Sequence, residues 1–325
     1  MPLKIHYISF PGLGIDEFKI NSNAIEIGNF KIAWYGLIIM VGIISAILYV
    51  WFRFRENNMS SDDLIDLALF TVVSGVVGAR LYYIIFSIIE DPSSYIVTNA
   101  GGFFANFGAS LGKMVSVWNG GLAIYGGIIA GGTAAVLVAR YKKINMLKIL
   151  DFLAPAVMLA QSIGRWGNFF NAEAHGGATN IFIKMGIRAE GSFSTYYYHP
   201  TFFYESLWNL VGFLAIWLIF VKLDKTKWLH KFNGQIFYTY LIWYGLGRSW
   251  IEGLRTDSLY LIPGVIRVSQ LVAILSVIAG TALMVYSLVM LKKGKENAFV
   301  KRVDVPKVVT EQNTEKKVEE NGENN

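Results

Sequence analysis

Three arginines each follow a long uncharged stretch. Arg80, Arg165 and Arg248 each follow 13 residues that carry no charge. The guanidinium group presents a planar fork of N–H donors that fits the oxygens of a phosphate or a carboxylate. The repeated spacing therefore predicts a site for an anionic ligand, held by long apolar segments.

The same spacing predicts how deep these arginines lie if the segments are membrane-spanning helices. Thirteen helical residues rise about 20 Å, past the middle of an apolar bilayer core about 30 Å thick. Arg80, Arg165 and Arg248 would then lie at a similar depth in the outer half of the bilayer, where charge is costly and commonly functional. Alternatively, an arginine near a helix end extends to the lipid headgroups. Both interpretations stay open for Arg80, which has Tyr82 and Tyr83 beside it.

Other polar residues accompany Arg165 and Arg248. Glu252 follows Arg248 by one helical turn, so we expect it to pair with that arginine or to accept a hydrogen bond from a hydroxyl group. Further candidates at the same end of the helices are Tyr35, Tyr125, Asn168, Asn171 and Glu173. Carboxamides and phenols can orient the hydroxyl and phosphate oxygens of a lipid headgroup.

The composition indicates which elements must hold these residues. Hydrophobic residues make up 54% of the 325, and charged residues only 16%, against about 25% in an ordinary soluble domain. This largely excludes a soluble enzyme, a coiled coil or a disordered main body. A β-barrel is disfavoured because its strands alternate in polarity instead of staying apolar for about 20 residues.

Seven segments can form membrane-spanning helices, each of which needs about 20 mostly apolar residues. Three are uncharged throughout, namely residues 32–52, 114–139 and 268–291. The other four are interrupted or shorter and comprise residues 64–89, 148–170, 206–221 (extending back to 201) and 235–251. We therefore predict an all-α, polytopic membrane protein with about seven transmembrane helices.

The charges of the loops predict the orientation. With the N-terminus outside, the inner loops carry 13 Lys and Arg residues and the outer segments 8, which favours a cytoplasmic C-terminus. Residues 1–31 have no apolar signal-peptide core, and we expect an extracytoplasmic arm. We expect residues 32–291 to form the transmembrane catalytic domain, 171–199 an extracytoplasmic loop or small head, and 292–325 a charged, disordered cytoplasmic tail.

Cysteine content and net charge narrow the chemistry further. The chain has no cysteine, so the protein itself supplies neither a disulfide nor a thiolate nucleophile. The net charge of +6 is better explained by basic cytoplasmic loops than by a nucleic-acid partner. No metal-ligand spacing occurs, so we expect neither a metal nor another cofactor.

Residues 164–176 read Gly-Arg-Trp-Gly-Asn-Phe-Phe-Asn-Ala-Glu-Ala-His-Gly. By itself the stretch indicates a helix end that breaks into a turn displaying Arg, Asn and Glu. It resembles the signature of bacterial prolipoprotein diacylglyceryl transferases, G-R-x-G-N-F-x-N-x-E-x-x-G, at every fixed position. Further segments similar to motifs of this family lie at 34–36, 78–81, 118–127, 151–155, 199–205 and 244–255.

One position departs from the family pattern. Many members have histidine, a possible proton acceptor, where this chain has Tyr125. Because a phenol is a poor base near neutral pH, either this position only forms hydrogen bonds or the base lies elsewhere. His175 and His199 are the nearest histidines at this end. His175 occupies a variable position of the signature, where a loop histidine is more often merely solvated, and His199 fits a helix cap or a headgroup contact.

The resemblance implies a function at the bacterial cell membrane, with the active site towards the outer leaflet. The diacylglyceryl group of phosphatidylglycerol would move to the lipobox cysteine of a preprolipoprotein signal peptide, forming a thioether and releasing glycerol phosphate. We expect catalytic roles for Arg165, Arg248, Glu252, Tyr125 and Tyr35. We expect phosphatidylglycerol to be bound by Arg165, Asn168, Asn171, Glu173, Gly176, Arg80 and Tyr244.

Two other functions compete with this interpretation. A secondary transporter or binding protein for an anionic lipid would also need buried arginines. Transporter sites, however, tend to lie at the membrane midplane between internal repeats, and the sequence shows no convincing repeat. A non-catalytic scaffold would leave the Arg, Asn and Glu constellation unexplained.

Overall fold

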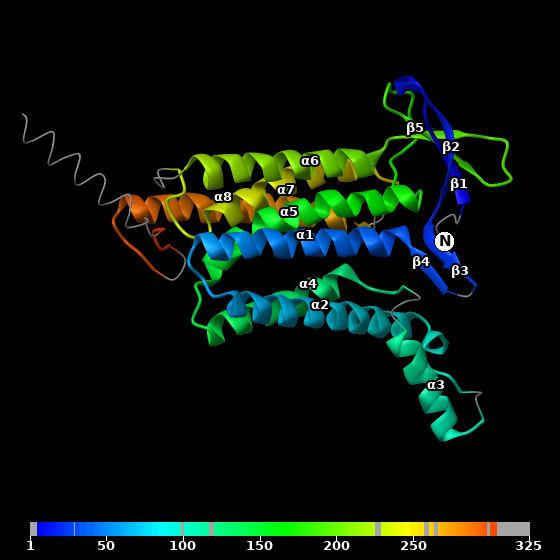
Figure 1. Cartoon of the computed structure of the whole chain (residues 1–325), viewed down its shortest axis with the longest axis horizontal. Coiled ribbons are helices and arrows are strands. Elements are labelled where there is room, and N and C mark those ends of the chain that lie inside the picture. Colours follow the sequence, from blue (N-terminus) through cyan, green and yellow to red (C-terminus); the bar gives the residue numbers. More distant parts are fainter. Residues whose placement is uncertain are drawn as a thin grey trace, which may run out of the picture. The chain divides into compact units, whose positions relative to one another are not determined.

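A computed structural model of the protein describes residues 5–28, 30–98, 101–116, 120–224, 229–256, 260–262, 266–297 and 300–303. The chain divides into two compact units. The first unit comprises Met1–Val50 with Leu147–Asn325, and the second unit is Trp51–Met146. Each is mainly helical (Figure 1).

Six helices among the described residues are long and apolar enough to cross a membrane. They are α1 (Trp34–Glu56), α2 (Ser61–Glu90), α4 (Ile124–Tyr141), α5 (Met146–Phe170), α6 (Thr201–Ile216, continued by a π-helical turn to Leu223) and α8 (Val268–Lys292). The seventh predicted helix is present as α7 (Gln235–Leu254), which is less apolar because it carries polar residues such as Arg248 and Glu252. The prediction of an all-α, polytopic membrane protein is therefore confirmed.

In the second unit, α2 and α4 pack closely along their length (Figure 1). Glycines permit this approach, because a Cβ atom at Gly78 would lie 2.7 Å from the backbone oxygen of Gly126. The short helix α3 (Phe103–Val115) follows α2. Only its last two residues, Met114 and Val115, belong to the span predicted over residues 114–139.

That long span, residues 114–139, was predicted wrongly at its beginning. Helix α3 ends at Val115 and α4 begins only at Ile124. Gly120 and Gly121 between them have φ angles of +85° and +76°, which a right-handed helix does not allow. Residues 117–119 of the glycine-rich motif lie outside the described residues.

Strands from two distant segments form one antiparallel sheet in the first unit. β1 (Ile5–Phe10) and β2 (Ile15–Asn21) come from the predicted arm, and β5 (Met185–Ala189) and β6 (Tyr196–Tyr198) from the predicted loop. Their order is β2-β1-β5-β6. Two small hairpins pair β3 (Asn23–Ile27) with β4 (Phe30–Ala33), and β7 (Tyr260–Ile262) with β8 (Ile266–Arg267).

This sheet packs on the ends of two helices that carry the site. Its buried residues Ile8, Ile20, Met185 and Ile187 share a hydrophobic cluster with Phe169 of α5 and Phe202 of α6. Figure 1 shows β1, β2 and β5 gathered at one end of α5 and α6. The arm and the loop therefore form one head that anchors the helix ends around residues 165–205.

The opposite end of α7 is held by one buried carboxylate. Asp151 of α5 accepts hydrogen bonds from the backbone N–H groups of Gly234 (2.6 Å) and Phe237 (2.9 Å). It also contacts Nε2 of His230 at 3.2 Å, and the backbone N–H of His230 donates to Asp224 at 2.5 Å. A carboxylate here satisfies N–H groups that the first turn of a helix leaves unpaired.

We expect Asp151→Ala to lower the free energy of unfolding by about 3 kcal/mol, because a hydrogen bond to a charged group contributes about 1.5–3 kcal/mol and several are lost together. Thermal unfolding in detergent, followed by circular dichroism, measures this change. Asp91→Ala is the matched control, since Asp91 caps only an exposed turn through Ser93. Equal losses for both variants would contradict the buried role of Asp151.

The beginning of the predicted tail is part of the first unit. The backbone N–H of Asn233 donates to the carbonyl of Lys301 at 2.9 Å, and Val300 is fully buried. Residues 304–325 lie outside the described residues, so their predicted disorder stays a prediction.

Candidate active site

Glu205, in the second turn of α6, contacts three arginines. Nη1 of Arg248 lies 2.8 Å and 2.9 Å from its two carboxylate oxygens, and Nη1 of Arg255 lies 3.2 Å from Oε1. Arg165 forms a close ion pair with Oε2. The Glu205 side chain is only 4% exposed. Helices α5, α6 and the end of α7 therefore converge on one buried carboxylate.

Glu252 extends this charged cluster. Its Oε2 lies 2.6 Å from Nη2 of Arg248, so the ion pair expected from their spacing is present. Arg267 donates to the backbone oxygen of Glu252. The arginines of this poorly solvated place outnumber its two glutamates, so the cluster carries a net positive charge. Such an excess favours the binding of an anion, because the attraction between opposite charges is stronger where water is excluded.

A chain of side-chain hydrogen bonds leads from Arg165 into the following turn. Nη1 of Arg165 donates to Asn168 at 3.3 Å. The amide groups of Asn168 and Asn171 each donate to Oε1 of Glu173 at 3.1 Å. Asn168, Asn171 and Glu173 thus form one polar wall beside Arg165, and their role in binding a headgroup stays a prediction.

The backbone of residues 172–177 is strained and is held in place by hydrogen bonds. Ala172 and Ala174 have φ angles of +49° and +55°, a region that costs a non-glycine residue about 1–3 kcal/mol and is concentrated at functional sites. The hydroxyl of Thr201 donates to the carbonyl of Ala174 at 2.5 Å. The N–H of Gly177 donates to the carbonyl of Leu254 at 2.9 Å. Residues 172–177, here called the 172–177 turn, are therefore clamped between the start of α6 and the end of α7.

Gly176 lies in the tightest part of this turn. Its N–H donates to the carbonyl of His199 at 2.9 Å, and a Cβ atom on it would lie 2.7 Å from the Cβ of His199 and 2.9 Å from the carbonyl oxygen of Leu254. No side chain fits there unless the backbone moves.

We expect Gly176→Ala to reduce turnover at least tenfold by moving the 172–177 turn away from the arginines. Steady-state kinetics in detergent measures the loss. Gly191→Ala is the control, because Gly191 has open space around it although its φ of +79° adds strain. Wild-type activity in Gly176→Ala would show that turnover does not require the 172–177 turn to lie this close to His199 and Leu254.

Tyr35 and Tyr244 lie on different helices of the first unit. The Tyr35 ring packs against Gly167, where a Cβ atom would come within 2.7 Å of it. Its phenol interacts electrostatically with Glu173 and Arg165. The Tyr244 ring stacks on another ring of α7, that of Tyr240, at 5.7 Å.

Arg80 and Tyr125 belong to the second unit, so their expected place beside Arg165 stays a prediction. Arg80 is 7% exposed. Its guanidinium donates at 2.7–3.1 Å to backbone carbonyls of Lys113, Met114, Ser116, Gly120 and Gly121. Arg80 thereby joins the end of α3 to the segment that precedes α4, and a phosphate could bind it only by replacing some of these bonds. Tyr125 is the second residue of α4 and is 38% exposed.

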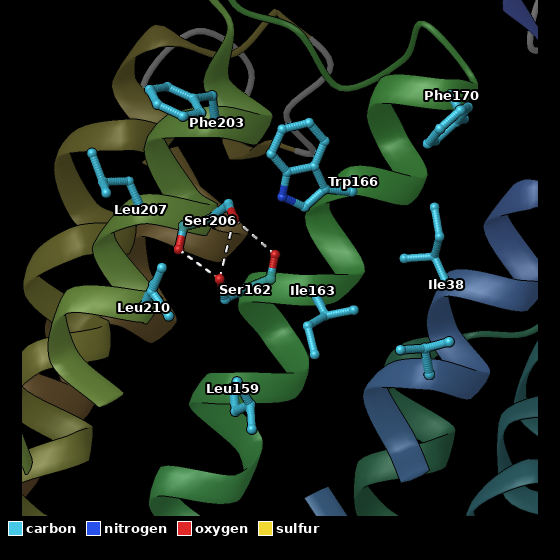
Figure 2. Close-up of a pocket in the computed structure, with 11 residues that line it drawn as sticks. Ile38, Leu159, Ser162, Ile163, Trp166, Phe170, Phe203, Ser206, Leu207 and Leu210 are labelled. Atoms are coloured by element: carbon cyan, nitrogen blue, oxygen red, sulfur yellow. Dashed lines mark hydrogen bonds between the residues drawn. The ribbon is translucent and has the colours of Figure 1, made fainter. Parts of the chain in front are cut away.

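A cavity of about 500 Å³ lies beside the charged cluster, between α1, α5 and α6 (Figure 2). Its lining includes Trp166 and Ser206, which directly follow Arg165 and Glu205 in the chain. The hydroxyls of Ser162 and Ser206 each donate to the other residue's backbone carbonyl at 2.9 Å. With these hydroxyls satisfied, the cavity offers an apolar surface.

Two residues of the cluster were not among the candidates from the sequence. Glu205 and Arg255 lie in segments similar to family motifs, but neither was given a role. One signal was available, because Glu205 is an acid inside an otherwise apolar segment, where charge is costly.

Comparisons with known proteins place the chain among membrane transferases. The family model for prolipoprotein diacylglyceryl transferase matches residues 22–286. A phosphatidylglycerol–prolipoprotein diacylglyceryl transferase of Clostridium novyi is 40% identical over 276 residues, covering 82% of this chain and 96% of the relative. Relatives with the same name are 38% identical in Clostridium perfringens (86% of this chain, 100% of the relative) and 41% identical in Streptococcus pneumoniae (81% and 92%).

Proposed function

The chain belongs to the prolipoprotein diacylglyceryl transferase family and is a transferase, and we propose that it acts on phosphatidylglycerol and the lipobox cysteine of a preprolipoprotein signal peptide. The diacylglyceryl group moves to the cysteine sulfur as a thioether, and glycerol phosphate is released. This is the first step of bacterial lipoprotein maturation.

The observation that carries this proposal is the convergence of Arg165, Arg248 and Arg255 on Glu205. The headgroup phosphate of phosphatidylglycerol is an anionic diester, which suits the net positive charge of the cluster. The Asn168–Glu173–Asn171 wall can bind the hydroxyls of the glycerol headgroup. Tyr35 and Tyr244 add phenol donors.

The reaction is a displacement at carbon. The cysteine sulfur forms a bond to the terminal glycerol carbon of the diacylglyceryl group, and the bond from that carbon to the phosphate oxygen breaks. The electron pair leaves with the phosphate, whose charge rises during the step. Arg165 and Arg248 stabilise this growing charge, and Glu205 and Glu252 hold the two guanidinium groups in place.

The lipid tail needs an apolar path next to the phosphate. The cavity between α1, α5 and α6 provides one, and we assign it to an acyl chain of phosphatidylglycerol (Figure 2). The loop charges favour an arrangement with the N-terminus outside and the site facing the outer leaflet of the bacterial cell membrane. The head formed by the arm and the loop would then meet the signal peptide outside.

The test uses purified protein in detergent with phosphatidylglycerol and a lipobox peptide. Glycerol phosphate release and the peptide's mass are followed, with the serine version of the peptide as control. Release coupled to a diacylglyceryl mass gain on the cysteine peptide alone is the expected result. Lipid that stays bound without any product would instead indicate a binding protein or secondary transporter for an anionic lipid.

A further inference from the structure

Transfer to a thiol requires a group that takes the thiol proton. The cysteine S–H must lose its proton as the sulfur–carbon bond forms, because the thiolate is the effective nucleophile. In the charged cluster, Glu205 is engaged by three arginines and Glu252 by Arg248. Glu173 accepts from two amide groups. The carboxylates of the site are thus occupied in holding other side chains.

Imidazole is the side chain that most often performs this task near neutral pH. The chain has four histidines. His6 is buried in the head sheet, and His230 contacts Asp151 at the opposite end of α7. His199 has its Nδ1 3.3 Å from the hydroxyl of Tyr204. His175 belongs to the 172–177 turn, two residues after Glu173.

The geometry points to His175. Its Nδ1 lies 3.1 Å from the carbonyl oxygen of Gly176, an oxygen that can only accept, so Nδ1 carries the hydrogen in the neutral ring. The other nitrogen, Nε2, then bears the lone pair, and it has no hydrogen-bond partner within the described part of the chain. The ring stacks on Tyr198 at a centroid distance of 4.1 Å, which fixes its plane.

Hydrogen bonds tie the 172–177 turn to the chain segments that carry the charged cluster. Thr201 lies one helical turn before Glu205 in α6, and its hydroxyl donates to the carbonyl of Ala174. Gly176, next to His175, pairs with Arg255, which itself contacts Glu205. His175 therefore belongs to a turn whose neighbouring residues are bonded to the start of α6 and to Arg255, and its side chain is partly exposed.

We propose that Nε2 of His175 takes the proton of the lipobox thiol during diacylglyceryl transfer. The S–H bond breaks towards Nε2, the sulfur–carbon bond forms, and the carbon–oxygen bond breaks with its electron pair left on glycerol phosphate. The imidazolium then returns its proton to the released phosphate, which restores the neutral ring. This inference rests on the proposed function.

The test compares a cysteine lipobox peptide with its selenocysteine version, because a selenol is already ionised near neutral pH and needs no base. With the cysteine peptide, we expect His175→Ala to lose about 10²–10⁴-fold in kcat/KM, the usual contribution of general base catalysis. The selenocysteine peptide should recover most of the kcat/KM that His175→Ala loses, whereas it should not recover the kcat/KM that Arg165→Ala loses. The KM for phosphatidylglycerol should stay near that of the wild type in His175→Ala.

The pH profile and a conservative variant complete the test. Titratable and charged groups around His175 are Glu173 on the turn, Tyr198 on β6, His199 and Tyr204 at the start of α6, and Arg255 at the end of α7. The acid limb of kcat/KM should disappear in His175→Gln, whose amide can still donate to Gly176, and persist in His199→Gln. The inference is wrong if His175→Gln keeps the wild-type pH profile of kcat/KM. It is also wrong if the selenocysteine peptide recovers none of the kcat/KM lost in His175→Ala. A wild-type protein without any turnover would instead refute the proposed function.

Discussion

Glu205→Gln is expected to lower kcat by about 10²–10³-fold, comparable to removing one preorganised electrostatic group from an active site. The amide keeps the shape of the side chain but removes the charge shared by Arg165, Arg248 and Arg255. It also turns N–H donors towards guanidinium groups that can only donate. The three arginines then repel one another and leave the geometry that suits the departing phosphate.

The separation of kcat from KM distinguishes this role from simple lipid binding. The variant cluster has a larger positive excess, so the KM for phosphatidylglycerol should not rise even though kcat falls. Glu190→Gln is the matched control, since the Glu190 side chain is half exposed and pairs with Lys19 at 3.4 Å, a surface pair worth no more than about 1 kcal/mol. A higher KM with unchanged kcat would show that Glu205 only helps to bind the lipid.

Arg165→Lys is expected to lower kcat/KM about 10²-fold, and Arg165→Ala by about 10³-fold or more, in line with the loss of a charge-stabilising donor. Lysine keeps the positive charge but not the planar fork by which Arg165 contacts Glu205 and Asn168 together. The smaller loss of kcat/KM in Arg165→Lys than in Arg165→Ala separates the contribution of charge from that of geometry. Initial rates of glycerol phosphate release measure both variants.

Arg188→Lys is the control for this substitution. Arg188, in the head sheet, forms two hydrogen bonds with Glu17 at 2.8 Å and 2.6 Å, and its guanidinium lowers the pKa of that carboxyl group. It has the same fork geometry but lies away from the cluster, so kcat should stay unchanged. Full activity in Arg165→Lys would mean that charge alone is needed at residue 165.

The positions of the helices could be predicted from the sequence, because hydropathy and helical spacing act over short distances. Segments 64–89 and 268–291 correspond to α2 and α8 within a few residues. The pairing of Arg248 with Glu252 also followed from their one-turn spacing. The error at residue 114 has a local cause, since hydropathy does not register the left-handed backbone at Gly120 and Gly121.

Glu205 shows what the sequence left undecided. Its partners Arg165, Arg248 and Arg255 are 40 to 50 residues away along the chain, and only the packing of α5, α6 and α7 brings them together. The head is a stronger example, because Arg188 and Glu17 meet across 171 residues. No local pattern encodes such a contact.

The sequence by itself therefore determined the apolar helices, the buried arginines and the signature around Arg165. The tertiary structure decided which charges neutralise one another, since electrostatic pairing depends on distance in space. It also decided that Arg80 binds backbone carbonyls, and that Gly176 orients His175, because hydrogen bonds require an approach to about 3 Å that only the folded chain provides.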